Sequence, residues 1–323
     1  MTLRIAGLLF ALGILAAPVV VDAQQPGRPY RIGVLHGAYF PGEPSTEGLK
    51  AGLKATGLEE GRDVTFDIRF TRGKLAASPA VAAALVKASM DLIFTIQEHE
   101  TRAAKAATQT IPIVFTGVGD PVAAGLVASV AHPGGNVTGV SSLATELVPK
   151  RLEILKAIIP ALRRVWVVYH ADDLSSVAAT RKAREVAPLL KLEVLARPVR
   201  TPEELVRELK ALRPGDGLLS PAARAMDIPG LILDLERGRR APAIFASTFW
   251  VQAGAVVSYG SDEYAEGIQA ARLVAKILRG ARPQDLPVEG ANKIELAINL
   301  KTARSLGVTI PRELWARADQ VIE

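Results

Sequence analysis

The sequence predicts an α/β protein built from two similar lobes, each with a parallel sheet between layers of helices. Short apolar runs alternate with longer amphipathic runs along the chain. Strands that are apolar almost throughout, each followed by a helix, are typical of parallel sheets with both faces covered. The alternation begins again after Pro160, and two such series in about 300 residues favour two lobes over one wide sheet.

Residues 1–23 have the pattern of a secretory signal peptide. Arg4 precedes an apolar run from Ile5 to Val21, and Ala23 provides a small residue for cleavage. We expect cleavage after about Ala23 and export to the periplasm. An uncleaved membrane anchor is the alternative, since about 17 apolar residues approach the shortest length that spans a bilayer. No cysteine follows the run, which excludes a lipid-anchored lipoprotein.

The composition excludes several kinds of site. The chain has no cysteine, which removes disulfides, thiolate metal ligands and cysteine nucleophiles. The formal net charge is +6 at pH 7, but the Lys and Arg residues are spread through predicted helices. Scattered charge is typical of a solvated surface, so we expect no nucleic-acid partner. No two of the 4 histidines stand at metal-ligand spacing, and we expect neither a metal nor a cofactor.

In the first series, each predicted strand is followed by a helix. The predicted strands are 30–37, 63–71, 91–97 and 111–118, and the series closes at 136–142. The predicted helices are 45–57, 79–89, 99–108 and 121–131. Ser45 is the expected N-cap of the first helix and Gly57 its stop, because polar residues cap helix starts and glycine ends helices.

The second series follows a helix at 149–160. Its predicted strands are 164–171, 192–199, 216–222 and 242–247, and its predicted helices are 176–191, 201–212 and 228–239. The low-glycine segment near 143–151 is the expected first crossing between the lobes. We therefore expect residues 29–142 and 247–284 in the first lobe, and residues 143–246 and 285–323 in the second.

The expected site lies in a crevice between the lobes. Ligands of open α/β sheets bind beyond the carboxyl ends of the strands, where helices begin and free backbone N–H groups point outward. The predicted strand ends fall at 37–40, 97–101, 116–121, 170–176 and 220–223. From these ends and from nearby aromatic residues, the expected ligand-binding residues are His36, Gly37, Ala38, Tyr39, Gln97, Glu98, Thr116, Asp120, His170, Ser220, Phe249 and Tyr259.

Phe249 and Tyr259 are included because aromatic residues make up only 5% of the chain. An aromatic side chain at a strand end could stack on an organic ligand. Packing in the core near a crossing between the lobes is the alternative for Phe249 and its neighbour Trp250.

The Gly-Val-Gly stretch at 117–119 raises the question of a phosphate-binding loop. It lacks the third glycine of a dinucleotide fingerprint, since Val122 stands there and Pro121 occupies the turn. A tight turn after a buried strand explains the glycines better, with Asp120 as N-cap of the following helix. Asp120 is either a cap alone or also a cleft residue, and the sequence leaves both open.

Two acidic stretches are interpreted as helix starts rather than as metal or catalytic sites. Residues 98–100, Glu-His-Glu, resemble a ligand cluster, but neighbouring residues on a helix point in different directions, which favours a solvated helix start. Asp172 and Asp173 are expected to form a turn and cap the next helix. No nucleophile has an obvious base partner and no G-x-S-x-G elbow occurs, so we expect no enzymatic activity.

Three segments carry a resemblance to a known family: residues 52–74, 111–141 and 279–323. Pro-Gly-Gly-Asn at 133–136 and Asn-Leu-Lys-Thr-Ala at 299–303 are the most specific motifs. The chain resembles the ABC-transporter substrate-binding family, in the branch that includes tryptophan- and tyrosine-type binding proteins. The resemblance covers essentially the whole chain after the signal.

This resemblance implies a periplasmic-binding-protein type I fold, with two Rossmann-like lobes joined by a hinge of three crossing strands. It also implies a small solute that is trapped between the lobes by hinge closure. An ABC permease and ATPase in the inner membrane are the implied partners. We further expect the protein to be a monomer.

Two turns depart from the family pattern. Such proteins usually carry a Gly-Thr-Pro type of turn where this chain has residues 96–99, and Asn-Pro where it has His170-Ala171. Glu98 could pair with a cationic group of the solute, and His99 or His170 with an anionic one. An amino-acid specificity is therefore not carried over from the family.

The predicted function is that of the periplasmic solute-binding component of an ABC importer, for an amino acid-like, aromatic or carboxylate solute. A periplasmic ligand-sensing protein for a membrane receptor kinase is one alternative, and a secreted α/β enzyme is another. Neighbouring genes for a permease and an ATPase would favour transport over sensing. An enzyme would need a nucleophile–base pair in the cleft.

Overall fold

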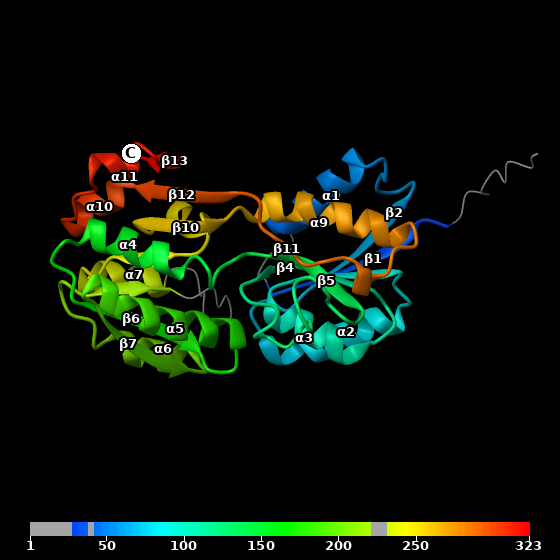
Figure 1. Ribbon diagram of the computed structural model, residues 1–323, viewed down its shortest axis with the longest axis horizontal. Coiled ribbons are helices and arrows are strands. Elements are labelled where there is room, and N and C mark those ends of the chain that lie inside the picture. The colour runs from blue at the N-terminus through cyan, green and yellow to red at the C-terminus, as the bar shows by residue number, and fades with distance from the viewer. Residues whose placement is uncertain (1–27, 38–41, 221–230) are drawn as a thin grey trace, which may run out of the picture.

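The computed structural model describes residues 28–37, 42–220 and 231–323, which form two lobes lying side by side along the long axis (Figure 1). Each lobe is a mostly parallel sheet covered by helices on both faces. The predicted α/β class with two mostly parallel sheets is thereby confirmed.

The first lobe has a parallel sheet in the order β11-β5-β4-β3-β1-β2. Its strands are β1 (Tyr30–His36), β2 (Val64–Phe70), β3 (Leu92–Ile96), β4 (Ile113–Val118), β5 (Val137–Ser141) and β11 (Glu289–Gly290). Its helices are α1 (Pro44–Ala55), α2 (Ser78–Lys87), α3 (Glu98–Ala107) and α9 (Glu263–Leu278), with short 3₁₀ turns at Leu75–Ala77 and Pro283–Asp285.

The second lobe has a sheet in the order β13-β12-β10-β9-β8-β6-β7, in which only the β10–β12 pair is antiparallel among the described strands. Its strands are β6 (Arg164–His170), β7 (Glu193–Val199), β8 (Gly217–Leu219), β9 (Ala243–Phe245), β10 (Val257–Ser261), β12 (Ile294–Asn299) and β13 (Gln320–Ile322). Its helices are α4 (Val148–Ile158), α5 (Leu174–Val186), α6 (Pro202–Leu209), α7 (Leu231–Arg239), α8 (Phe249–Gln252), α10 (Leu300–Leu306) and α11 (Arg312–Trp315), with a 3₁₀ turn at Ala187–Leu190.

Both faces of each sheet are buried in apolar clusters, as the continuous apolar strands predict. In β1, Ile32 and Val34 pack into the cluster that includes α1 and α9, whereas Leu35 packs into the cluster that includes α2 and α3. In the second lobe, α4, α5 and α10 contribute to one cluster and α6, α7 and α8 to the other. Alternate side chains along a strand therefore pack into two separate apolar clusters, one on each face of the sheet.

The sheets divide the chain at other points than the predicted lobe boundaries. Strand β10 pairs with β9 and β12 in the second sheet, although 247–284 was expected in the first lobe. Strand β11 pairs with β5 in the first sheet, although 285–323 was expected in the second lobe. The chain therefore passes between the sheets after β5, after β10 and after β11.

Arg151 ties two of these crossings together. It lies in α4 and is only 1% exposed. Its Nη1 donates to the carbonyl of Ala144 at 3.0 Å, in the first crossing, and its Nε donates to the carbonyl of Tyr259 at 2.7 Å, shortly before the second. Burial lowers the pKa of Arg151 to about 10, so the guanidinium stays charged at neutral pH.

Two local predictions are wrong. Residues 121–131 form turns instead of a helix, because Gly125 adopts a left-handed φ of 67° after a single turn and ends it. The N-cap of α1 is Glu43 rather than Ser45, since the Glu43 carboxylate accepts from Thr46 N at 3.0 Å.

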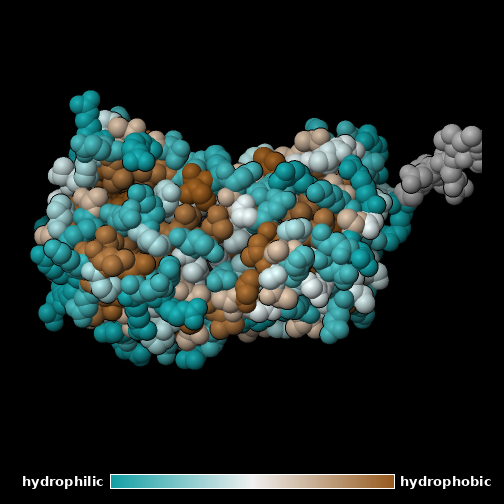
Figure 2. Space-filling view, in the orientation of Figure 1, coloured by the Kyte–Doolittle hydropathy of each residue, from teal (hydrophilic) through white to brown (hydrophobic). Residues whose placement is uncertain are grey.

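The surface carries hydrophilic residues over both lobes, and hydrophobic residues reach it in several separate areas, including the junction of the lobes (Figure 2). This view agrees with the scattered charge in the sequence. Among the helices of the described residues, none combines the length and the apolar character needed to cross a membrane.

The contact between α1 and α9 leads to a prediction about stability. A Cβ added at Gly267 would lie 2.1 Å from the carbonyl oxygen of Ser45, so Gly267→Ala forces two backbones apart. We expect this change to lower the free energy of unfolding by roughly 1–3 kcal/mol in urea titrations. Gly238→Ala in α7 is the control, since its Cβ would meet nothing within 4 Å. Equal effects of the two substitutions would contradict this account of the packing.

Candidate functional site

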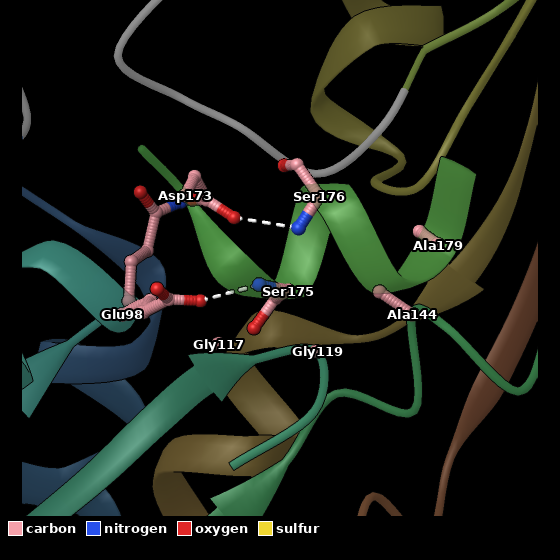
Figure 3. Close-up of a pocket in the computed structure, with 9 residues that line it drawn as sticks. Glu98, Gly117, Gly119, Ala144, Asp173, Ser175, Ser176 and Ala179 are labelled. Atoms are coloured by element: carbon pink, nitrogen blue, oxygen red, sulfur yellow. Dashed lines mark hydrogen bonds between the residues drawn. The ribbon is translucent and has the colours of Figure 1, made fainter. Parts of the chain in front are cut away.

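The candidate site is a cavity between the lobes, at the carboxyl ends of strands from both sheets (Figure 3). Its described lining residues are Gln97, Glu98, Gly117, Gly119, Ala144, Asp173, Ser175, Ser176 and Ala179. The first four belong to the first lobe, Ala144 belongs to a crossing, and the others belong to the second lobe. The cavity volume is about 10 Å³, which is room for about one water molecule, so the two walls are nearly in contact.

Glu98 makes the principal contact across this cleft. It is the first residue of α3 and is only 4% exposed. Its Oε1 accepts from the backbone N–H of Leu174 at 2.9 Å. Its Oε2 accepts from the backbone N–H of Ser175 at 2.7 Å, the bond drawn in Figure 3. The guanidinium of Arg102, one turn later in α3, forms an ion pair with the same carboxylate. A carboxylate from the first lobe therefore sits on the positive N-terminal end of α5.

Arg102 also contacts the second lobe, since its Nη1 donates to the carbonyl of Asp172 at 3.1 Å.

Asp173 is the N-cap of α5, as predicted, and its Oδ1 accepts from Ser176 N at 2.6 Å. Burial and the nearby charge of Glu98 raise the pKa of Asp173 to about 6. The start of α5 thus holds two carboxylates from opposite sides of the cleft.

The end of β4 and the turn after it form another part of the wall, through Gly117 and Gly119. Gly117 has a left-handed φ of 70°, which explains the glycine at this position. Its N–H donates at 2.8 Å to Oε2 of Glu266, a buried residue of α9. Asp120 caps a turn instead of the predicted helix, and it also makes a contact across the cleft, while its role in ligand binding stays a prediction. Its Oδ1 accepts from Ala123 N at 2.9 Å, and its backbone N–H donates across the cleft to the hydroxyl of Ser175 at 3.3 Å.

Of the other residues predicted in the first lobe, Gln97 lines the cavity and Thr116 and His36 are buried. Gln97 adopts a φ of 78°, and its N–H donates to the carbonyl of Thr116 at 2.8 Å. His36 is buried and stacks on Phe70 with 5.6 Å between ring centroids. Gly37 lies beside the Glu100 carboxylate, and a Cβ there would be 3.0 Å from Oε1. The other two residues predicted in this turn, Ala38 and Tyr39, lie outside the described residues.

The predicted residues of the second lobe are less close to one another. His170 is buried before α5, and its Nδ1 accepts from Asp172 N at 3.2 Å. Ser220 is buried at the end of β8, and its N–H donates to the carbonyl of Ile244 at 3.0 Å.

His99 lies in α3 of the first lobe. Burial lowers its pKa, which weakens the suggestion that it holds an anionic group.

The two aromatic candidates pack in the second lobe. Phe249 lies edge-on to Trp250, with 5.8 Å between ring centroids, beside the cluster of α6 and α7. Tyr259 packs against the cluster of α4 and α5. These contacts agree with the core-packing alternative for Phe249, and contact of either ring with a ligand stays a prediction.

Sequence reasoning missed part of the cleft. Glu98 and Glu100 are buried, so the interpretation of 98–100 as a solvated helix start is wrong. Ser175 and Ser176 line the cavity and lay within the predicted strand-end segment 170–176, but no signal separated them from their neighbours. The ion pair of Arg102 with Glu98 follows i,i+4 helix spacing, which the sequence does contain.

The raised pKa of Asp173 predicts that the stability of the protein depends on pH. This pKa is higher in the folded protein, about 6, than its ordinary value of 3.8. The folded state therefore binds the proton more tightly, and the contribution of this group to stability falls as pH rises from about 4 to above 6. Asp173→Asn keeps a capping side chain but removes the charge. We expect the variant to melt at a higher temperature than the wild type at pH 7.5 and at the same temperature below pH 4.

Thermal melts of both proteins at several pH values measure this difference. The comparison cancels other groups, such as Glu236 and Glu266, whose pKa values burial raises to about 8. Asp285→Asn, on an exposed turn, is the control and should show no such trend. A constant difference between Asp173→Asn and the wild type at every pH would contradict the prediction.

Solved structures resemble the whole two-lobed arrangement. A conserved domain protein from Vibrio cholerae is 31% identical with a TM-score of 0.83, over 91% of this chain and 100% of that one. An ABC domain in complex with L-Trp from Streptococcus pneumonia is 25% identical with a TM-score of 0.81, over the same shares of the two chains. The ligand-free, open structure of a substrate-binding protein with adhesive properties from Clostridium difficile is also 25% identical, but its TM-score is 0.68, over 91% of this chain and 99% of that one.

Sequence comparison gives the same relationship. A tyrosine-binding protein of Clostridioides difficile (strain R20291) is 28% identical over 275 residues, which are 81% of this chain and 77% of that protein. Residues 42–322 match the model of a family described as ABC transporter substrate binding protein. That match includes every described strand except β1 and all the described lining residues of the cavity. The chain therefore belongs to the ABC transporter substrate-binding protein family.

Proposed function

We propose that this protein is the periplasmic solute-binding component of an ABC importer and traps a small amino acid-like solute between its lobes by hinge closure. The observation that carries the proposal is the cleft itself. Donors and acceptors of the first lobe, Glu98 and Asp120, meet the N-terminus of α5 in the second. Such contacts form only when the lobes are together, as a trap that closes around its ligand requires.

The kind of solute is inferred from the chemistry of the cleft and from relatives. Helix N-termini and backbone N–H groups at the carboxyl ends of strands bind a carboxylate. Two similar proteins are described as tyrosine-binding and as a complex with L-Trp. We therefore propose a solute that carries a carboxylate and an organic side chain. The proposal includes export by the N-terminal signal, a monomeric state, and delivery to a membrane permease and its ATPase.

Opening of the cleft is part of this proposal. The cavity has room for about one water molecule. An amino acid therefore fits only after the lobes separate or the lining side chains move out of the cavity. The lower TM-score to the open relative than to the tryptophan complex, at equal identity, supports a closed arrangement of the lobes in this structure.

A ligand screen tests the proposal. We expect one or more of L-tyrosine, L-tryptophan, other amino acids and aromatic acids to raise the melting temperature. At a hundredfold excess over its dissociation constant, a specific ligand adds about 2.7 kcal/mol to the free energy of unfolding. D-amino acids are the control, because a shaped cleft distinguishes enantiomers. No shift with any compound, together with turnover of one of them, would overturn the proposal.

A further inference from the structure

We propose that Glu98 is an internal competitor of the solute: its carboxylate occupies the place at the N-terminus of α5 where a solute carboxylate would bind, and it holds the lobes together without a solute. The inference rests on the proposed function, since it concerns the same cleft. It makes Glu98 the residue that sets how strongly this protein discriminates among solutes with and without a carboxylate.

The donors at the start of α5 are all used by the chain itself. The N–H groups of Leu174 and Ser175 donate to Glu98, and that of Ser176 donates to Asp173. These are the first three residues of a helix of 13 residues, and they carry the N–H groups that a helix leaves unpaired. An anionic group that enters the cleft finds each of these donors taken.

The Glu98 carboxylate is also well held. It is 4% exposed, accepts two charge-assisted hydrogen bonds and pairs with Arg102. Charge-assisted bonds of this kind are about twice as strong as neutral ones. Since Glu98 belongs to the first lobe and its two N–H donors to the second, the energy of these two hydrogen bonds favours the closed arrangement. The ion pair with Arg102 lies within α3 and orients the Glu98 carboxylate.

The cavity offers no place for a second anion beside Glu98. Among its described lining residues none is Lys or Arg, and two, Glu98 and Asp173, are acidic. Glu146 and Asp120 add negative charge nearby, and burial together with the charge of Asp120 raises the pKa of Glu146. A solute carboxylate therefore binds at α5 only by displacing Glu98.

Displacement has a thermodynamic consequence. A solute carboxylate binds only to molecules in which Glu98 has moved away from α5. The apparent affinity for that solute is therefore the intrinsic affinity multiplied by the fraction of molecules in this state. Removing the charge of Glu98 raises that fraction. It should therefore tighten the binding of solutes with a carboxylate, whereas removal of a true solute ligand would weaken binding.

The test is Glu98→Gln in the mature protein, with L-tyrosine and L-tryptophan as probes and tyramine and tryptamine as their analogues without a carboxylate. We expect Glu98→Gln to bind the amino acids about tenfold more tightly or better, since a hydrogen bond to a charged group is worth roughly that factor. The affinity for the two amines should change less. Glu185→Gln on the exposed end of α5 is the matched control and should change neither.

A second measurement needs no ligand. Small-angle scattering of the solute-free protein should show a larger radius of gyration for Glu98→Gln than for the wild type. Leu174→Pro should do the same, because it deletes the N–H that donates to Oε1 from the other lobe. Proline is tolerated at this first helical position, and Asp173 before it is already extended, with φ −92° and ψ 105°.

The outcomes separate the two proposals. Weaker binding of the amino acids to Glu98→Gln, or an unchanged radius of gyration in both variants, overturns the role of Glu98. If the variants open but no probe binds to any of the proteins, Glu98 does hold the lobes together and the proposed solute class is wrong. Circular dichroism confirms that each variant is folded.

Discussion

The first lobe depends on direct backbone contact between two helices that are far apart in the sequence. A Cβ at Gly48 would lie 2.0 Å from the carbonyl of Tyr264, and one at Gly267 would lie 2.1 Å from that of Ser45. Helix α9 enters the lobe only after the second crossing, so this glycine contact fixes where the returning chain docks. A larger residue at either glycine would hold α9 away from α1.

The same contact supports one wall of the cleft. Glu266, the neighbour of Gly267, is buried and accepts from the N–H of Gly117. Burial raises the pKa of Glu266 to about 8, so the group is largely protonated at neutral pH and adds little charge to the cleft. The Gly117 turn in turn aims the N–H of Asp120 at Ser175 in the other lobe. Docking of α9 is thereby linked through three residues to the geometry of the site.

The sequence predicted what local patterns determine. Apolar strands that alternate with helices predicted the class of fold, because burial on both faces leaves a continuous apolar run. The candidate cavity lies at the edge of the sheets where the sequence placed a site. The lobe boundaries were not predictable from such patterns, since the sheet to which β10 and β11 belong depends on pairing with distant strands. Burial of Glu98 was missed for the same reason, because its donors at Leu174 and Ser175 are 76 and 77 residues away.

Glu98 bridges the two lobes through its own carboxylate, and this determines what closes the cleft. In a two-lobed binder with only small residues at this position, the solute supplies the anion that bridges the lobes. Here the bridging carboxylate is part of the chain, so its local concentration never falls and closure needs no solute. The free energy of solute binding is then only the difference between the interactions of the solute and those of Glu98 at the same place. Tight binding therefore requires contacts that Glu98 cannot make, which the side chain of the solute must supply.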